Sequence, residues 1–151
     1  MRKGKVWPAA IAVLVFAADR VTKILARNIP AEGVPVIPGV IGLRYAENRG
    51  IAFSLLSGVP WLTGALSLAI IVAGFLFLRG KRIPPLPMAG LMMMLGGATG
   101  NMVDRFGFGY VTDMIEPLFV RFAVFNVADA CLTVGCGLVI LSLLTGWKKE
   151  G

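Results

Sequence analysis

Residues 127–147 of the chain read VADACLTVGCGLVILSLLTGW, a stretch whose one charged residue is Asp129. A helix needs about 20 apolar residues to cross roughly 30 Å of hydrocarbon, and this stretch has that length. Three earlier stretches have similar length and composition: Trp7–Ala26, Val59–Leu78 and Pro87–Asp104. Of the 151 residues, 57% are hydrophobic, more than a soluble domain of this size can bury. The sequence therefore predicts an all-α membrane protein with four transmembrane helices.

Basic residues cluster at three places, which four spanning helices would bring to one side of the membrane. The clusters are Arg2, Lys3 and Lys5, then Arg79, Lys81 and Arg82, and finally Lys148 and Lys149. Because short cytoplasmic loops carry the Lys/Arg excess, we expect a multi-pass protein with both termini in the cytoplasm. The connections 27–58 and 105–126 would then face outward. The net charge of +7 mostly reflects this topology, so we expect membrane lipids, and not nucleic acid, as a partner.

The chain length leaves room for one helical bundle, so we expect a single domain over residues 1–151. A basic start before the first apolar stretch resembles a signal peptide. However, Asp19, Arg20 and Lys23 interrupt the apolar core that such a peptide needs. We therefore expect the first helix to be retained.

The two outward-facing connections contain strand signals. Residues 34–45, VPVIPGVIGLRY, combine β-branched residues with Pro and Gly, a pattern typical of short strands and tight turns. Residues 110–113 and 119–125 repeat the theme and are apolar enough to enter the membrane interface. We expect a small β-sheet on the outer membrane surface.

Polar residues of separate predicted helices fall at the same depth in the membrane. They are Asp19 and Lys23 in the outer half of the first helix, Asn101, Asp104 and Arg105 at the outer end of the third, and Asn126 and Asp129 at the start of the fourth. Within each helix these residues are three or four positions apart, so they share a face. Their convergence in one leaflet indicates a site more strongly than any single residue does.

The charged residues of the first and third helices also have a structural interpretation. Asp19 can pair with Lys23 one turn later, and the neighbouring charge of Arg105 can partly offset Asp104. Asparagine side chains would then bridge the helices. An ionisable group inside a membrane is nevertheless a candidate for function by default, so both interpretations stay open here.

Asp113 and Asp129 differ, because neither has a basic residue three or four positions away. They could be a solvated loop acid and a helix N-terminal acid favoured by the helix dipole. Alternatively, two carboxylates held close together share one proton and titrate as a pair. One can then act as general base on a water while the other donates to a carbonyl oxygen. The chain contains no histidine, which removes the commonest general base.

Other residues carry weaker alternatives. Ser54 or Ser57 with Lys23 could form a Ser/Lys pair, but a lysine already paired with Asp19 is a poor base. Cys131 and Cys136, five residues apart in one helix, point about 140° from each other and cannot form a disulfide there. Without histidine they also give no usual zinc-ligand set, so we expect no metal. Small-residue spacing at Gly96, Gly97 and Gly100 favours close helix packing.

Five segments, in order along most of the chain, resemble the motif set of the lipoprotein signal peptidases, or signal peptidase II. They are DRVTK (19–23), NRGIAF (48–53), GGATGNMVDR (96–105), VTD (111–113) and FNVAD (125–129). The resemblance implies an aspartic endopeptidase of the bacterial inner membrane. Such an enzyme removes the signal peptide from diacylglyceryl-modified prolipoproteins, cutting just before the lipid-bearing cysteine. It also implies four membrane helices with a small β-cradle on the periplasmic side, where the active site would lie.

Carried over by motif, the resemblance implies that Asp113 and Asp129 are the catalytic pair that activates a water. Supporting or substrate-contacting positions would be Asp19, Lys23, Asn48, Gly50, Asn101, Asp104, Arg105 and Asn126. Met114 stands where an aromatic residue is more usual, which bears on packing and not on the chemistry. We expect no metal or organic cofactor, and a monomer.

Two other classes of protein share parts of this pattern. A small channel or proton-coupled transporter would need polar groups through the whole membrane depth, whereas the inner halves here are almost purely apolar. A non-catalytic assembly factor would share the topology but would not need an unpaired aspartate pair.

Overall fold

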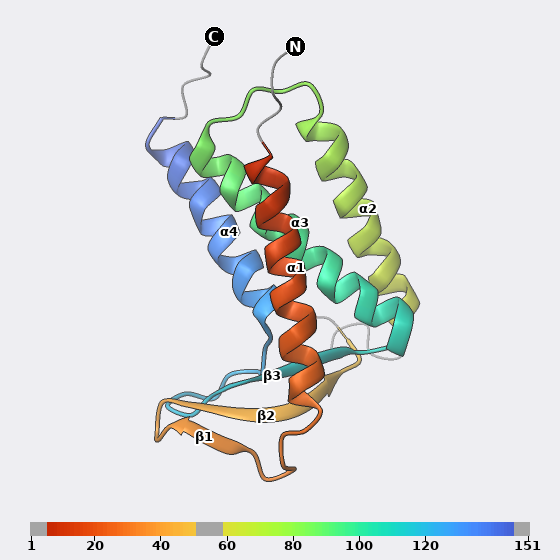
Figure 1. Cartoon of the computed structure of the whole chain (residues 1–151), viewed down its shortest axis with the longest axis vertical. Helices are drawn as coiled ribbons and strands as arrows, with labels where there is room; N and C mark the ends of the chain where they lie inside the picture. Colours follow the sequence, from red (N-terminus) through yellow and green to blue (C-terminus); the bar gives the residue numbers. More distant parts are fainter. Residues whose placement is uncertain (1–5, 51–58, 147–151) are drawn as a thin grey trace.

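The computed structural model describes residues 6–50 and 59–146. The elements follow the order α1 (Trp7–Ala26), β1 (Val34–Ile37), β2 (Ile41–Asn48), α2 (Pro60–Leu78), α3 (Pro85–Phe108), β3 (Val111–Pro117) and α4 (Val127–Leu144). The helices form one bundle, and the sheet lies across one end of it, beyond the end of α1 and the start of α4 (Figure 1). The connection between α2 and α3 lies at the opposite end.

The helices match the predicted apolar stretches, with three differences in their bounds. Helix α2 begins one residue later than predicted, at Pro60, and α4 ends at Leu144, before the predicted end at Trp147. The largest difference is in α3. Helix α3 begins at Pro85 and ends at Phe108, beyond the predicted bounds at both ends. The prediction ended with the apolar pattern, but a helix continues until the backbone leaves the helical region. Gly109 does this with a φ of 76°, which glycine adopts at little cost, and its N–H donates to the carbonyl of Arg105.

The predicted small sheet is present, with antiparallel strands in the order β1-β2-β3. Strand β3 comes from the second connection and pairs along β2, so that Asp113 lies opposite Ala46. Phe125 extends this pairing, because its N–H donates to the carbonyl of Ile115 at 3.0 Å and its carbonyl accepts from the N–H of Ile115 at 2.8 Å. The start of α4 is thereby attached to the strand that carries Asp113.

Helix α3 is central and packs against α1, α2 and α4. Glycines permit this close packing, as predicted. A Cβ atom on Gly97 would lie 2.6 Å from the carbonyl oxygen of Ala128 in α4, and one on Gly100 would collide with the carboxylate of Asp19 in α1. Any larger residue at these positions would separate the helices that carry the polar groups.

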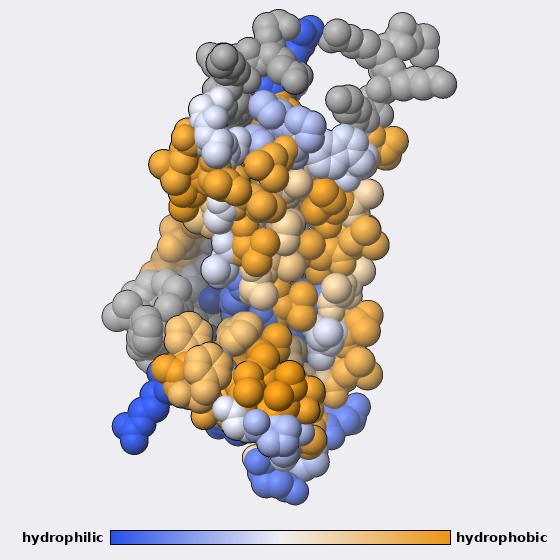
Figure 2. All heavy atoms as spheres, turned by 90° about the vertical axis from the view of Figure 1, so that its left-hand side faces the viewer, coloured by the Kyte–Doolittle hydropathy of each residue, from blue (hydrophilic) through white to orange (hydrophobic). Residues whose placement is uncertain are grey.

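The distribution of side chains is inverted relative to a soluble protein. Fully buried side chains include Asp19, Lys23, Asp104 and Asn126, whereas large apolar side chains along all four helices are exposed. Figure 2 shows apolar residues over much of one side of the bundle. Among the described residues, α4 is the one helix whose length and mean hydropathy of 2.2 suit a membrane crossing, and 61–76 in α2 is a shorter apolar segment.

Candidate active site

The start of α4 places Asp129 through a local capping arrangement. Asn126 is the N-cap residue, and its Oδ1 accepts a hydrogen bond from the N–H of Asp129 at 2.9 Å. In return, Oδ2 of Asp129 accepts from the N–H of Asn126 at 3.4 Å. This reciprocal capping box satisfies two N–H groups that the helix itself cannot bond. Capping alone explains an acid at this position, but it does not explain the contacts that Asp129 makes to other elements.

Two asparagine amides connect Asp129 to Asp113. Nδ2 of Asn101 in α3 donates to Oδ1 of Asp129 at 2.8 Å. Nδ2 of Asn126 donates to Oδ1 of Asp113 at 2.6 Å and makes a longer bond, 3.3 Å, to Oδ1 of Asn101. Neither aspartate has an ion-pair partner within 4.0 Å in the part of the chain that the structure describes. The two carboxylates are therefore held by hydrogen bonds from neutral amides and not by direct ion pairs.

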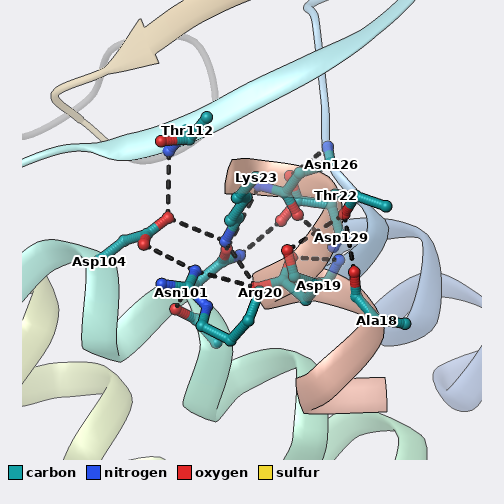
Figure 3. Close-up of polar contacts among 12 residues, drawn as sticks. Ala18, Asp19, Arg20, Thr22, Lys23, Asn101, Asp104, Thr112, Asn126 and Asp129 are labelled. Atoms are coloured by element: carbon teal, nitrogen blue, oxygen red, sulfur yellow. Dashed lines mark hydrogen bonds and ion pairs between the residues drawn. The ribbon is translucent and has the colours of Figure 1, made fainter. Parts of the chain in front are cut away.

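A buried charge cluster supports the asparagines (Figure 3). Nζ of Lys23 lies 2.9 Å from Oδ2 of Asp19, 2.9 Å from Oδ2 of Asp104 and 2.8 Å from Oδ1 of Asn101. Arg20 pairs with the same two acids, at 2.7 Å from Asp104 and 3.2 Å from Asp19. Two acids and two bases thus balance in charge, and Lys23 orients the amide of Asn101 so that its N–H points toward Asp129.

The cluster also holds separate elements together through backbone groups. Oδ1 of Asp19 accepts from the N–H of Ala128 in α4, and Oδ2 of Asp104 accepts from the N–H of Thr112 in β3, both at 3.1 Å. Since Ala128 and Thr112 each precede a candidate catalytic aspartate by one residue, the cluster fixes the backbone beside both of them.

Two predicted pairings have different outcomes. The pair between Asp19 and Lys23 is confirmed. The charge of Arg105 does act on Asp104, as predicted, but the direct ion pairs of Asp104 are with Arg20 and Lys23. Consecutive residues of a helix point about 100° apart, so Arg105 faces another direction.

The burial of Asp113 changes its acidity. Its side chain is 2% exposed, and burial raises the pKa of Asp113 from 3.8 to about 6, with the negative charge of Asp129 acting in the same direction. Hydrogen bonds from Asn126 and Asn48 and the positive charge of Lys23 oppose this rise in pKa. Asp113 can therefore hold a proton at a pH where an exposed carboxyl group is ionised.

A cavity of about 690 Å³ opens beside Asp129. Asn48, Asn101 and Arg105 contribute polar groups to its wall. Apart from Ser67 and Thr133, the remaining lining is apolar, from segment 122–125 and from Ala98, Val111, Ala130, Leu132 and Val134. The cavity thus combines a carboxylate and hydrogen-bonding groups with a hydrocarbon-like wall, which suits an amphipathic ligand. Asp113 lies against this site but is not part of the cavity wall.

Residues 11–145 match the model of a protein family described as signal peptidase (SPase) II. The chain belongs to the signal peptidase II family. It is accordingly an enzyme, a membrane aspartic endopeptidase, as the sequence motifs implied.

Curated relatives and solved structures agree with this family. The lipoprotein signal peptidase of Streptococcus thermophilus is 39% identical over 99% of this chain and 97% of its own length. That of Latilactobacillus sakei is 42% identical over 72% of this chain and 73% of its own. Two solved structures, both described as bacterial membrane enzymes, superpose with TM-scores of 0.84 and 0.80 at 30% and 31% identity. They cover 95% and 91% of this chain, and 92% of each solved chain is covered.

The structure of this signal peptidase II brings the predicted site residues into one region. Seven of them belong to the hydrogen-bonded network already described: Asp19, Lys23, Asn101, Asp104, Asp113, Asn126 and Asp129. The other three extend this network: Asn48 hydrogen-bonds to Asp113, the N–H of Gly50 donates to Oδ1 of Asn48 at 3.1 Å, and Arg105 donates to the carbonyl of Gly50 at 3.4 Å. Residues 51–53 of the 48–53 motif, together with Ser54 and Ser57, lie outside the described residues.

One site residue was missed. Arg20 contacts Asp19, Asp104 and the carbonyl of Gly100, although it was not among the predicted site residues. A signal for it existed, because two buried acids need two positive charges and Lys23 supplies one. The aromatic wall of the cavity at 122–125 had no comparable signal, since apolar residues before a membrane helix are common.

Proposed function

We propose that the chain cleaves diacylglyceryl-modified prolipoproteins just before the lipid-bearing cysteine, with Asp113 and Asp129 as the acid/base pair. The observation that carries this proposal is the placement of two aspartates on linked asparagine amides beside an apolar cavity. The aspartates can perform the chemistry of peptide hydrolysis, and the cavity has the character that a lipid-modified peptide requires.

The proposed mechanism uses one water and one shared proton. The ionised carboxylate takes a proton from the water as its oxygen attacks the scissile carbonyl carbon, and the protonated carboxyl donates to the carbonyl oxygen. On collapse of the tetrahedral intermediate, a proton passes to the leaving amine and the C–N bond breaks. The amides of Asn101 and Asn126 keep the carboxylates oriented throughout, because each donates to Oδ1 of one aspartate. This chemistry requires neither a metal nor an organic cofactor.

We further propose that all four helices cross the bacterial inner membrane, with the sheet on the periplasmic side and both termini in the cytoplasm. The exposed apolar side chains of the helices support this placement, as does the exposed basic connection at 79–82, which lies at the end away from the sheet. The described buried charges lie toward the sheet end, which favours a site in the outer leaflet over a path through the membrane. In this arrangement a monomer contains every proposed site residue.

The proposal is tested with purified protein and a purified diacylglyceryl-modified precursor in detergent micelles. Mass spectrometry of the product should show a new N-terminus at the lipid-bearing cysteine. The matched substrate is the same precursor without the lipid, which we expect to remain intact. Equal cleavage of both precursors would refute the proposed role of the lipid, and no cleavage of either by folded protein would refute the proposed activity.

A further inference from the structure

A group of exposed apolar side chains covers one edge of the sheet. It is formed by two segments that are far apart in sequence, the end of β1 with the β1–β2 turn, and the connection that follows β3. Its members are Val36, Ile37, Val40, Leu118, Phe119, Val120 and Phe122, with exposed fractions from 42% for Leu118 to 70% for Phe119. Phe122 also lines the cavity described above, so the patch adjoins it. Figure 2 shows apolar side chains gathered at the sheet end of the molecule, with hydrophilic residues at the tip beyond them. We call segments 36–40 and 118–122 the edge patch.

The two segments of the edge patch form one surface. The N–H of Leu118 donates to the carbonyl of Val40 at 2.9 Å. The side chain of Leu118 also lies over the backbone of β2, 3.4 Å from where a Cβ of Gly42 would be. Single exposed apolar residues are common on any protein, but a contiguous group from two segments marks a surface that contacts something apolar.

The position of the edge patch identifies the lipid bilayer as the apolar partner that this surface contacts. Segment 118–122 leads directly into Phe125, which pairs with β3, and then into Asn126, the N-cap of α4. The patch is therefore continuous with the point where α4 begins, at the level of the outer leaflet in the placement proposed above. Arg121, exposed between Val120 and Phe122, adds a positive charge that suits lipid phosphate groups.

We propose that the edge patch inserts into the outer leaflet, with its apolar side chains among the acyl chains and Arg121 at the lipid phosphates. Strand β3 carries Asp113 and runs without a break into Leu118, so the inserted patch would hold this aspartate at a constant depth. The inserted patch would thereby hold Asp113 at the depth of the scissile peptide bond, which lies next to a lipid anchored in the membrane. The inference rests on the proposed membrane placement and substrate.

Insertion is tested by fluorescence quenching in vesicles. In a Cys131→Ala/Cys136→Ala background, Phe119→Cys is labelled with an environment-sensitive fluorophore and the protein is placed in phosphatidylcholine/phosphatidylglycerol vesicles. Glu32→Cys, an exposed position in the turn before β1, is the matched control. We expect nitroxide-labelled lipids to quench the Phe119 label and aqueous iodide to quench the Glu32 label. Equal iodide quenching at both positions would overturn the proposal. Protection that grows with protein density in the vesicles would indicate a second copy as the contact, and would overturn it too.

The functional consequence is tested with Phe119→Asp, because Phe119 is not part of the cavity wall. We expect its cleavage of a vesicle-embedded lipidated precursor to fall roughly tenfold, while its cleavage in detergent micelles stays within about twofold of wild type. Equal activity of Phe119→Asp and wild type in vesicles would refute the depth role. A wild type that is inactive in both media would refute the proposed function instead, and the quenching result would stand independently of it.

Discussion

Replacing Lys23 with methionine removes the central cation of the buried charge cluster. Its side chain is 3% exposed, and its Nζ lies 2.9 Å from both Asp19 and Asp104, whose side chains are 0% and 1% exposed. Water therefore cannot reach the two acids to solvate the negative charge that Lys23 had neutralised. Removing one partner of a buried ion pair costs about 3–5 kcal/mol. Because Arg20 still contacts both acids, we expect the free energy of unfolding to fall by about this amount and not by twice as much.

The assay for this prediction is unfolding by sodium dodecyl sulfate in mixed micelles, followed by circular dichroism. Arg44→Gln is the matched control, since Arg44 pairs with Glu116 at 2.8 Å but the two side chains are 45% and 26% exposed. An exposed pair contributes about 0–1 kcal/mol, so this variant should unfold almost like wild type. Adding Asp104→Asn to Lys23→Met should recover part of the lost stability, because one acid then faces one base. The reasoning is refuted if Lys23→Met costs no more than Arg44→Gln, or if the second substitution destabilises further.

Three further predictions concern acidity, capping and packing. Because the pKa of Asp113 is raised to about 6 from 3.8, the native state should lose stability as the pH rises through this interval, and Asp113→Asn should remove that loss in unfolding measurements at pH 4 and pH 7. Cleavage should fall at acid pH as both carboxyls become protonated. The pair loses its shared proton at higher pH, which gives the profile an alkaline limb. Asn48→Ala removes a hydrogen bond that lowers the pKa of Asp113, so it should move this alkaline limb to higher pH; an unmoved alkaline limb would contradict the assignment. Asn126→Ala should cost about 0.5–2 kcal/mol through the lost cap and should also reduce cleavage, whereas Thr145→Ala, at the other end of α4 and outside the cavity wall, should leave cleavage unchanged. Gly100→Ala should destabilise by about 1–3 kcal/mol because its Cβ would collide with Asp19, while Gly107→Ala on the same helix has open space and should be neutral or slightly stabilising; equal effects would refute the packing argument.

Hydropathy predicts the helices of this chain well, because the length of an apolar stretch is a local property. Helix α1 has the predicted bounds, and α3 differs where Gly109 and not hydropathy ends it. Strand signals likewise predicted a sheet. The pairing of β2 with β3, which puts Asp113 opposite Ala46, joins residues far apart in sequence, and no local pattern specifies such a register.

Part of the candidate site could also be predicted from the sequence, because some of its contacts follow from local spacing. Helix spacing correctly paired Asp19 with Lys23, because residues four apart share a face. Sequence adjacency predicted the charge effect of Arg105 on Asp104 but not the direct ion-pair partners, Arg20 and Lys23, because these lie on another helix. The asparagine link between Asp113 and Asp129 and the apolar cavity both arise from packing between elements, which a single sequence does not display.

The role of the aspartate pair is tested most directly by cleavage of the lipidated precursor with Asp113→Asn and Asp129→Asn, each purified and shown to unfold cooperatively. Glu116→Gln is the matched control, because it removes an acid from the same strand as Asp113 without touching the asparagine network. We predict that each aspartate variant loses at least roughly 100-fold in cleavage rate, while Glu116→Gln retains wild-type activity. Retained cleavage by either folded aspartate variant would contradict the assignment of Asp113 and Asp129 as the catalytic pair.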